Sequence, residues 1–458
     1  MKKVFFRIAV TGIVLFFTGT VYGSASFDLS PADPGKVALI LYDIEAGKEV
    51  VSINADTPLY YASNLKMLTT ASALHYLGGG FRYYTMFAFD SSEGTLYIRA
   101  MGDPEMVIEK MWVLANELKN RGVAGIKKVV IDDFMYGEKG FDFVEGGRFG
   151  DNAYLAHVSP IGLNYNAVEI TIEADEPEKP VNVRLTTPGP HFEITNSAVG
   201  IKGSGNNIVV GAVPKDGKTE IVVRGSLGVN RQSPVKIYRR VAYPANHYIE
   251  TLLFLMGEQS VPIERRRLVR CDMIRADRIN YTHKSSAMRD ILTTMNRYSS
   301  NYIAECIQYF MGAVLRGDPK QGVELMKEYA LTHLGEEVDI VNGSGLGNDK
   351  NKLPGSFYLK LLQKFHNDRY GLIDFFYSMP VIGEDGTLQK ALFDNGCLGC
   401  IRGKTGSLTG VTALSGIMRA KSGKVYLYVF AVNEFPAQSF RVTWNFRDKI
   451  MRQVWENY

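Results

Sequence analysis

The chain has 458 residues, of which 46% are hydrophobic and 22% are charged, and its formal net charge is +4. This length predicts two or more domains, and the hydrophobic fraction excludes a generally disordered chain. Because the basic residues form no long run, the charge pattern excludes nucleic acid as a main partner. The composition leaves the oligomeric state open.

The first 25 residues have the three-part layout of a secretory signal. Basic residues at positions 2, 3 and 7 precede the apolar run Ile8–Phe17, and small residues follow up to Ala25. Cleavage is expected after Gly23 or Ala25, with an uncleaved anchor as the alternative. The apolar run is shorter than the roughly 20 residues that cross a bilayer, and no later stretch is long enough. The sequence therefore predicts export to the periplasm or cell envelope.

A β-hairpin and a buried helix are predicted next. The β-rich runs Val37–Asp43 and Glu49–Ile53 flank a turn that contains glycine, which is typical of a hairpin. From Asn64 to Leu77, leucine and alanine recur at a spacing of three, and the other sides are fairly apolar too. A helix that is apolar nearly all round is a buried one.

From about residue 84 the pattern changes to short alternating strands. Runs such as Val168–Glu173 and Glu220–Arg224 are separated by spacers rich in glycine and proline, and this predicts a β-rich module long enough to be a domain. Helical patterns then return at 245–259, 286–297 and 301–315.

The C-terminal part is predicted to be a second hairpin followed by a helix. Val411–Met418 and Val425–Val432 flank a turn, and Phe446, Ile450 and Val454 then recur at a spacing of four. Packing of this terminal helix on a sheet is expected. Peripheral association with a membrane surface is the alternative.

The four cysteines favour a disulfide over a metal site. Cys397 and Cys400 form a single Cys-x-x-Cys pair, and no second pair or histidine pair at finger spacing accompanies them. A structural zinc site therefore has little support. In an oxidising compartment, a local disulfide is expected at this pair. Cys271 and Cys306 either pair with each other or remain buried thiols.

Ser63-Asn-Leu-Lys66 is the first candidate for chemistry. A serine in the first turn of a helix lies near unpaired backbone N–H groups that can bind an oxyanion. A lysine three positions later lies on the same helix face, and as a neutral amine it can accept the serine proton. The motif alone is weak, because Ser233-Pro-Val-Lys236 also matches it and because a plain N-cap serine has the same pattern.

Two further motifs strengthen the interpretation. Lys404-Thr-Gly406 precedes the second hairpin, where a glycine in an edge strand lets a substrate backbone approach closely. Ser299-Ser-Asn301 lies between two predicted helices, where a hydroxyl can relay a proton and an amide can hold a peptide group. Arg402, two strand positions before Lys404, either adds to carboxylate binding or is a solvated surface arginine.

The order and context of these three motifs resemble the penicillin-binding protein and serine β-lactamase superfamily. Because Ser63 and Ser299 are far apart, a β-rich insert must separate the first two motifs, as in the class C low-molecular-mass penicillin-binding proteins, the D-alanyl-D-alanine carboxypeptidase/endopeptidase family. Five further stretches are similar to this family: 62–69, 102–105, 159–166, 342–346 and 383–388. The chain departs from it at Ser300 and Asn342, where the family often has aspartate, and the insert is short for the family.

The resemblance implies an α+β fold in which a β-lactamase/transpeptidase-like domain carries a β-rich insert. The expected division is a signal at 1–25, a catalytic domain at 26–83 and 260–458, and an inserted domain or domains at 84–259. The implied partners are peptidoglycan stem peptides, with β-lactams as covalent inhibitors. Neither a cofactor nor a metal is implied.

The resemblance also implies a mechanism through an acyl-serine intermediate. Lys66 takes the proton of Ser63, which attacks the carbonyl between two D-alanines. The backbone N–H groups of Ser63 and Ser407 hold the oxyanion, and water later hydrolyses the acyl-enzyme.

The remaining motif residues are expected to handle the leaving group and the substrate. Ser299 and Lys404 pass a proton to the leaving amine, and Asn301 holds the substrate amide. Thr405 binds the terminal carboxylate, next to Gly406 in the substrate-binding strand. The alternatives are a serine β-lactamase and a non-catalytic protein that binds the wall or senses β-lactams.

Overall fold

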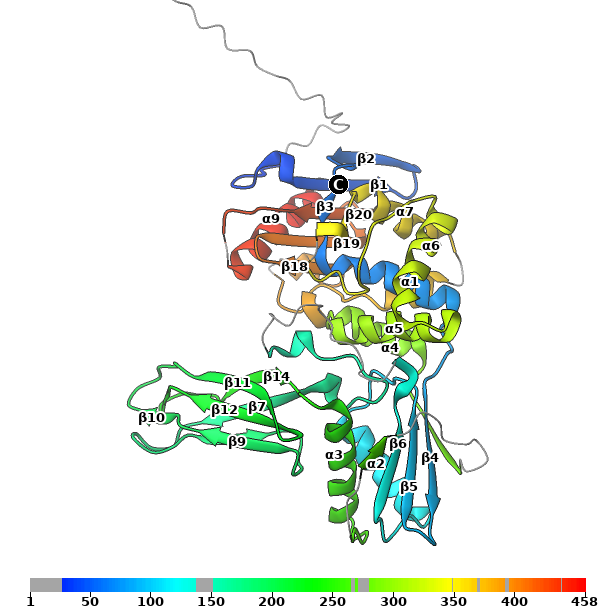
Figure 1. Ribbon diagram of the computed structural model, residues 1–458. Helices are drawn as coiled ribbons and strands as arrows, with labels where there is room; N and C mark the ends of the chain where they lie inside the picture. The colour runs from blue at the N-terminus through cyan, green and yellow to red at the C-terminus, as the bar shows by residue number, and fades with distance from the viewer. Residues whose placement is uncertain are drawn as a thin grey trace, which may run out of the picture.

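The computed structural model describes residues 27–136, 151–264, 268–270, 280–347, 349–368, 371–391, 395–437 and 439–458. The expected signal at 1–25 lies outside these residues. Figure 1 shows an upper region of mixed helix and sheet, formed by the first and last parts of the chain, and two lobes below it, formed by the middle of the chain. The fold is of the predicted α+β class, with mostly antiparallel sheets.

A five-stranded antiparallel sheet forms the centre of the upper region. Its strand order is β18-β19-β20-β1-β2, and its strands are β1 (Val37–Asp43), β2 (Lys48–Ile53), β18 (Ile401–Leu408), β19 (Val411–Arg419) and β20 (Val425–Val432). Both predicted hairpins are confirmed. Pairing of β1 with β20 joins them into one sheet, and the Lys404 motif lies on the edge strand β18.

Both faces of this sheet are covered, which explains why its strands are apolar on both faces. Ala38 and Ile40 of β1 belong to a core shared with α1, α5 and α7, whereas Val37, Leu39 and Leu41 belong to a core shared with α9. The helices of the upper region are α1 (Lys66–Tyr76), α4 (Met288–Arg297), α5 (Asn301–Arg316), α6 (Gly322–Leu334), α7 (Gly355–Asn367), α8 (Gly371–Tyr377) and α9 (Phe440–Asn457).

The terminal helix α9 packs on the sheet as its sequence pattern predicts. Phe446, Ile450 and Val454 are buried in the core that lies between α9 and the sheet. In the part of the chain that the structure describes, no helix is both long and apolar enough to cross a membrane.

The cysteines follow the expectation where they are described. Cys397 and Cys400 form the local disulfide predicted from their spacing. Cys306 is a buried free thiol on α5. Cys271 lies outside the described residues.

The first lobe is a mixed sheet with two helices on it. The sheet has the order β15-β6-β5-β4-β16, and the residues of α2 (Ile108–Asn120) and α3 (Pro244–Glu258) share its core. The strands are β4 (Tyr84–Asp90), β5 (Thr95–Ala100), β6 (Lys128–Asp132), β15 (Leu268–Arg270) and β16 (Tyr281–Lys284).

The second lobe is built from β-strands around its own apolar core. Its three small sheets have the orders β14-β7-β8, β11-β12-β9 and β10-β13. The strands are β7 (Ala167–Glu173), β8 (Asn182–Leu185), β9 (Phe192–Asn196), β10 (Val199–Ile201), β11 (Val209–Lys215), β12 (Lys218–Arg224), β13 (Ser226–Gly228) and β14 (Val235–Arg240). The alternating runs in the sequence correspond to this lobe.

Two features of the lobes differ from the sequence analysis. Helix α2 lies within the stretch interpreted as β-rich, because Trp112 and Val113 on its exposed side obscure the helical spacing of the buried Met111 and Leu114. The predicted insert ends at residue 259, but β16 pairs with β4. The first lobe therefore extends to residue 284.

Candidate active site

Ser63 lies in a short turn that leads into helix α1. The 3-10 turn covers Ala62–Leu65 and α1 begins at Lys66, so the helix predicted from Asn64 to Leu77 is divided after Leu65. Ala62 has a φ of 47°, which is unusual for a residue other than glycine. A Cβ on Gly345 would lie 2.0 Å from the Ala62 carbonyl oxygen. Close packing of the neighbouring loop thus holds the strained backbone before Ser63.

Lys66 is buried at the centre of the site. Its Nζ lies 2.9 Å from Ser63 Oγ, 2.7 Å from Asn301 Oδ1 and 2.8 Å from the Ser344 carbonyl oxygen. Burial lowers the pKa of Lys66 to about 7, and the negative charge of Glu305 opposes this shift. At neutral pH, a large fraction of Lys66 is therefore an unprotonated amine next to a serine hydroxyl. Such an amine can serve as a general base.

The two serines before α5 have different tasks. Ser300 is the N-cap of α5 and its side chain accepts a hydrogen bond from the Ile303 N–H. Ser299 has a φ of 56°, and its Oγ accepts a hydrogen bond of 2.9 Å from Lys404 Nζ. Ser300 is therefore the helix cap, while Ser299 contacts Lys404 in the site.

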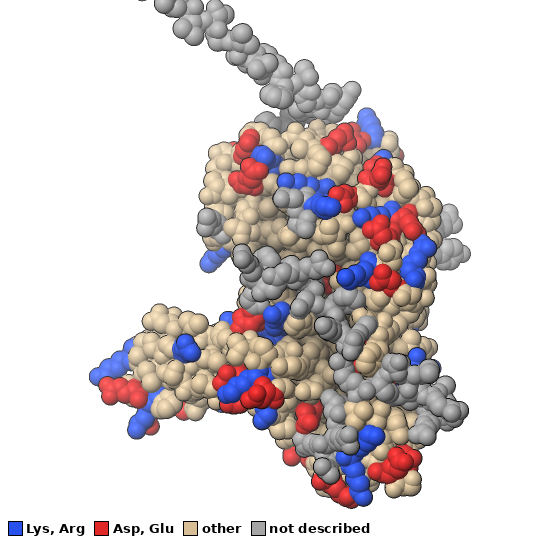
Figure 2. All heavy atoms as spheres, viewed as in Figure 1, with Lys and Arg blue, Asp and Glu red and all other residues tan. Residues whose placement is uncertain are grey.

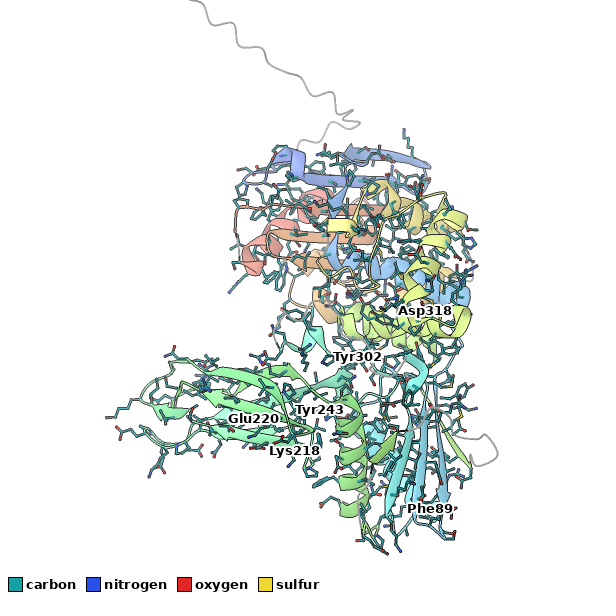
Figure 3. All side chains as sticks on the ribbon, viewed as in Figure 1. Phe89, Lys218, Glu220, Tyr243, Tyr302 and Asp318 are labelled. Atoms are coloured by element: carbon teal, nitrogen blue, oxygen red, sulfur yellow. A yellow bond between two sulfur atoms is a disulfide. The ribbon has the colours of Figure 1, made fainter. Side chains whose placement is uncertain are left out.

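Asn301 joins the site to the inserted lobes. Its Oδ1 accepts from Lys66, and its Nδ2 lies 3.5 Å from the Tyr154 carbonyl oxygen. The next residue, Tyr302, is buried where α5 meets the lobes, close to the ring of Tyr165, and its label in Figure 3 marks this junction. The N-terminal end of α5 thus contacts both the site and the insert.

Lys404 is a second buried lysine. Besides Ser299, its Nζ donates to the Thr405 carbonyl oxygen at 2.8 Å. Burial and the positive charge of Lys66 hold the pKa of Lys404 well below its usual range. A carboxylate that enters such a site favours the protonated lysine and is in turn attracted by it.

The predicted substrate-binding residues lie on the edge strand β18. Thr405 Oγ1 is 2.7 Å from Thr387 Oγ1, and Ser407 Oγ accepts a hydrogen bond of 2.8 Å from Trp444 Nε1. At Gly406, a Cβ would lie 2.2 Å from the Tyr61 carbonyl oxygen. A glycine is required here because the strand runs against the backbone just before Ser63.

Arg402 fits neither of its two predicted environments. Its Nη1 donates to the carbonyl oxygens of Tyr377 and Met379 at 3.2 and 3.1 Å, and its guanidinium lies over the Tyr377 ring. These contacts tie β18 to the end of α8. The arginine is therefore occupied by backbone carbonyls.

One buried acid in the site, Glu305, belongs to none of the three predicted motifs. Glu305 is almost completely buried on α5, and its Oε1 accepts a hydrogen bond of 2.9 Å from the Ser344 N–H. Burial raises the pKa of Glu305 to about 7. The signal was present in the sequence, since Glu305 follows Asn301 by four residues and therefore lies on the same helix face.

The loop 342–346, one of the stretches that resemble the family, contributes hydrogen-bonding groups to the site. The Ser344 carbonyl accepts from Lys66, and Asn342 Oδ1 accepts from the Gly345 N–H at 2.9 Å. Thr387, from another such stretch, touches Thr405. The site therefore gathers residues from five separate segments around one serine and two lysines.

This arrangement can perform acyl transfer. A hydroxyl next to a buried amine is a nucleophile with its base, and the Ser299–Lys404 pair can deliver a proton on the other side. Among the described residues, no group of three or more histidines, cysteines or acids could hold a metal ion.

The chain is similar in sequence to D-Ala-D-Ala carboxypeptidases. The model of the D-Ala-D-Ala carboxypeptidase 3 (S13) family matches residues 27–453. A D-alanyl-D-alanine carboxypeptidase of an Actinomadura species is 27% identical over 429 residues, which are 86% of this chain and 77% of that protein.

Two solved structures share the fold. Penicillin-binding protein 4 of Haemophilus influenzae superposes with a TM-score of 0.77 at 18% identity, covering 94% of this chain and 98% of that one. A predatory endopeptidase of Bdellovibrio bacteriovorus, acylated by penicillin G, superposes with a TM-score of 0.54 at 14% identity, covering 92% and 91%. These superpositions extend over the upper region and the lobes together.

Proposed function

The chain belongs to the D-Ala-D-Ala carboxypeptidase 3 (S13) family, and from this premise we propose that Ser63 is the nucleophile of its serine-type D-Ala-D-Ala carboxypeptidase reaction. The main support is the 2.9 Å contact between Ser63 Oγ and Lys66 Nζ. Lys66 is buried and has a pKa of about 7, so it can accept the serine proton at neutral pH.

In the acylation step, Lys66 takes the proton of Ser63 as Oγ forms a bond to the carbonyl carbon of the penultimate D-alanine. The backbone N–H groups of Ser63 and Ser407 hold the oxyanion. When the tetrahedral intermediate collapses, the peptide C–N bond breaks and Lys404 supplies a proton through Ser299 to the leaving amine. D-Alanine leaves, and water then hydrolyses the ester on Ser63.

Substrate binding is assigned to β18 and α5. The substrate backbone lies along β18, where Gly406 allows close approach. The terminal carboxylate of the substrate lies near Thr405 and Lys404. Its negative charge stabilises the protonated form of Lys404, which burial disfavours. Asn301 holds the amide of the stem peptide. The same chemistry cleaves a peptide cross-link when the leaving amine belongs to a second stem peptide.

We place this reaction in the cell envelope, on peptidoglycan stem peptides. The N-terminal pattern supports export, and the substrate occurs outside the cytoplasm. On the face drawn in Figure 2, basic and acidic side chains are interspersed over the upper region and the lobes. Over its described residues, this face therefore carries no patch of a single charge sign.

D-Alanine release from a peptide that ends in D-Ala-D-Ala is the direct test of this function. The wild-type chain is expected to release D-alanine and to be blocked by benzylpenicillin through a covalent adduct. Nitrocefin separates the alternatives. Rapid nitrocefin hydrolysis would indicate a β-lactamase, and neither acylation nor hydrolysis would indicate a binding protein.

Acylation by benzylpenicillin is expected to slow as the pH falls below about 7. The pKa of Lys66 is lowered to about 7, and a protonated amine cannot accept the Ser63 proton. The rate constant of adduct formation, measured by intact-protein mass spectrometry from pH 5 to 9, should follow the unprotonated fraction of Lys66. A rate that stays constant down to pH 5 would contradict this role.

The adjacent pair Ser299 and Ser300 provides a matched test of position. Ser300→Ala removes the N-cap of α5 and is expected to cost about 1 kcal/mol of stability while leaving the D-alanine release rate nearly unchanged. Ser299→Ala is expected to keep the melting temperature and to reduce release by about 100-fold, as for loss of a proton relay. The reverse pattern would exchange the two assignments.

A further inference from the structure

Glu305 is a buried ionisable group that the acylation scheme does not use. Its side chain lies among the helices at 1% exposure, and carboxyl groups are almost never fully buried without a partner. Its partners are in the loop 342–346, where the Ser344 N–H donates at 2.9 Å. The Ser344 side chain and the Gly343 backbone also hydrogen-bond to this carboxyl group.

Ser344 connects Glu305 to the general base. The Ser344 N–H is bound by Glu305, while its carbonyl oxygen accepts from Lys66 Nζ at 2.8 Å. The preceding Gly343 is held on the other side, because its carbonyl accepts from Thr69 Oγ1 at 2.6 Å. The Gly343–Ser344 peptide unit is thus fixed from both α1 and α5. It adjoins the Ser344 carbonyl that accepts from Lys66 Nζ and so helps to set the direction of that amine.

Few charged groups surround Glu305 and Lys66. Lys66 of α1 and the N–H groups of 343–344 favour the ionised form of Glu305, against the burial that raises its pKa. Cys306, the next residue on α5, stays a neutral thiol because burial raises its pKa. From β18, Lys404 is the second lysine of the site, and burial and the charge of Lys66 hold its pKa well below the usual range. Glu305 is thus the acid among the described residues whose charge acts on Lys66.

We propose that Glu305 is a positioning residue for Lys66 in the acylation step, an inference that rests on the proposed function. The carboxylate fixes the Ser344 carbonyl and so directs Lys66 Nζ toward Ser63 Oγ. Its negative charge stabilises the ammonium that forms when the Ser63 proton moves to Nζ. Glu305 itself exchanges no proton with the substrate.

The test is the pH profile of benzylpenicillin acylation in Glu305→Gln. Glutamine keeps an oxygen for the Ser344 N–H but removes the charge that raises the pKa of Lys66. The acid limb of the profile, which is the pH range where acylation slows as Lys66 becomes protonated, is therefore expected to move to lower pH by about one unit. The plateau rate is expected to fall about tenfold, because the base is weaker.

Asp103→Asn is the matched control. Asp103 is another buried carboxyl group, and burial raises its pKa to about 6, but the charges that act on it are those of Lys110 and Glu105. This variant is expected to keep the wild-type acid limb. An acid limb that stays in place in Glu305→Gln, whatever happens to its plateau, would overturn the proposal and leave Glu305 a structural role. A wild-type chain without any adduct would instead reject the proposed function itself.

Glu305→Asp covers the case in which Glu305→Gln does not fold. Aspartate keeps the charge but withdraws the carboxylate from Ser344 by one methylene. The acid limb is then expected to stay within about half a pH unit of the wild type, and the plateau to fall about tenfold through loss of orientation. A plateau within twofold of the wild type would contradict the positioning role.

Discussion

Ser63→Ala is expected to abolish the covalent adduct with benzylpenicillin while the chain folds as the wild type does. The substitution removes only the Oγ that accepts from Lys66, and Lys66 keeps Asn301 and Ser344 as hydrogen-bond partners. Loss of a serine nucleophile lowers turnover by about 10⁶-fold in a well-studied serine hydrolase. Intact-protein mass spectrometry should show one adduct on the wild type and none on the variant.

Ser233→Ala is the control for this experiment. Ser233-Pro-Val-Lys236 matches the same four-residue pattern, but Lys236 is half exposed on β14 and pairs with Glu169 at 2.8 Å. This variant should be acylated like the wild type. An adduct on Ser63→Ala, or its loss in Ser233→Ala, would place the nucleophile elsewhere.

The elements that bear the motifs could be predicted because their patterns are local. The spacing of apolar residues alone predicts the two hairpins and the buried helix. Both hairpins occur where expected, in the sheet formed by β1, β2 and β18–β20. The structure also brings Lys66 into contact with Ser63 and Asn301, and it brings Lys404 into contact with Ser299. Their order along the chain indicated this arrangement.

Contacts between distant segments could not be predicted in the same way. The Lys66–Ser344 bond joins α1 to a loop far along the chain, and no periodicity records such a contact. The helix cap shows a second limit of the sequence. Either of the two adjacent serines could cap the following helix, and only the start of α5 at Asn301 assigns the cap to Ser300. The predicted end of the insert at residue 259 differs from the structure for a similar reason. Strand β16 pairs with β4, which lies far earlier in the chain, and no local pattern indicates this pairing.

Lys66→Met is the second substitution for which a large effect is expected. Methionine fills a similar apolar volume but cannot accept a proton, and loss of a general base costs about 10²- to 10⁴-fold in rate. Adduct formation should therefore fall by this factor at pH 8, where wild-type Lys66 is largely neutral. Lys236→Met, at the second match to the motif, should keep the wild-type rate.

The same variant tests the burial of the lysine independently of activity. The pKa of Lys66 is lowered from 10.5 to about 7 in the folded chain, so between these values the unfolded chain binds more protons than the folded one. Stability then rises with pH across this window. Lys66→Met removes this contribution, and its melting temperature should rise less between pH 7 and 10 than that of the wild type. Equal pH dependence in the two proteins would show that Lys66 stays protonated when folded, and a protonated Lys66 could not be the base for Ser63.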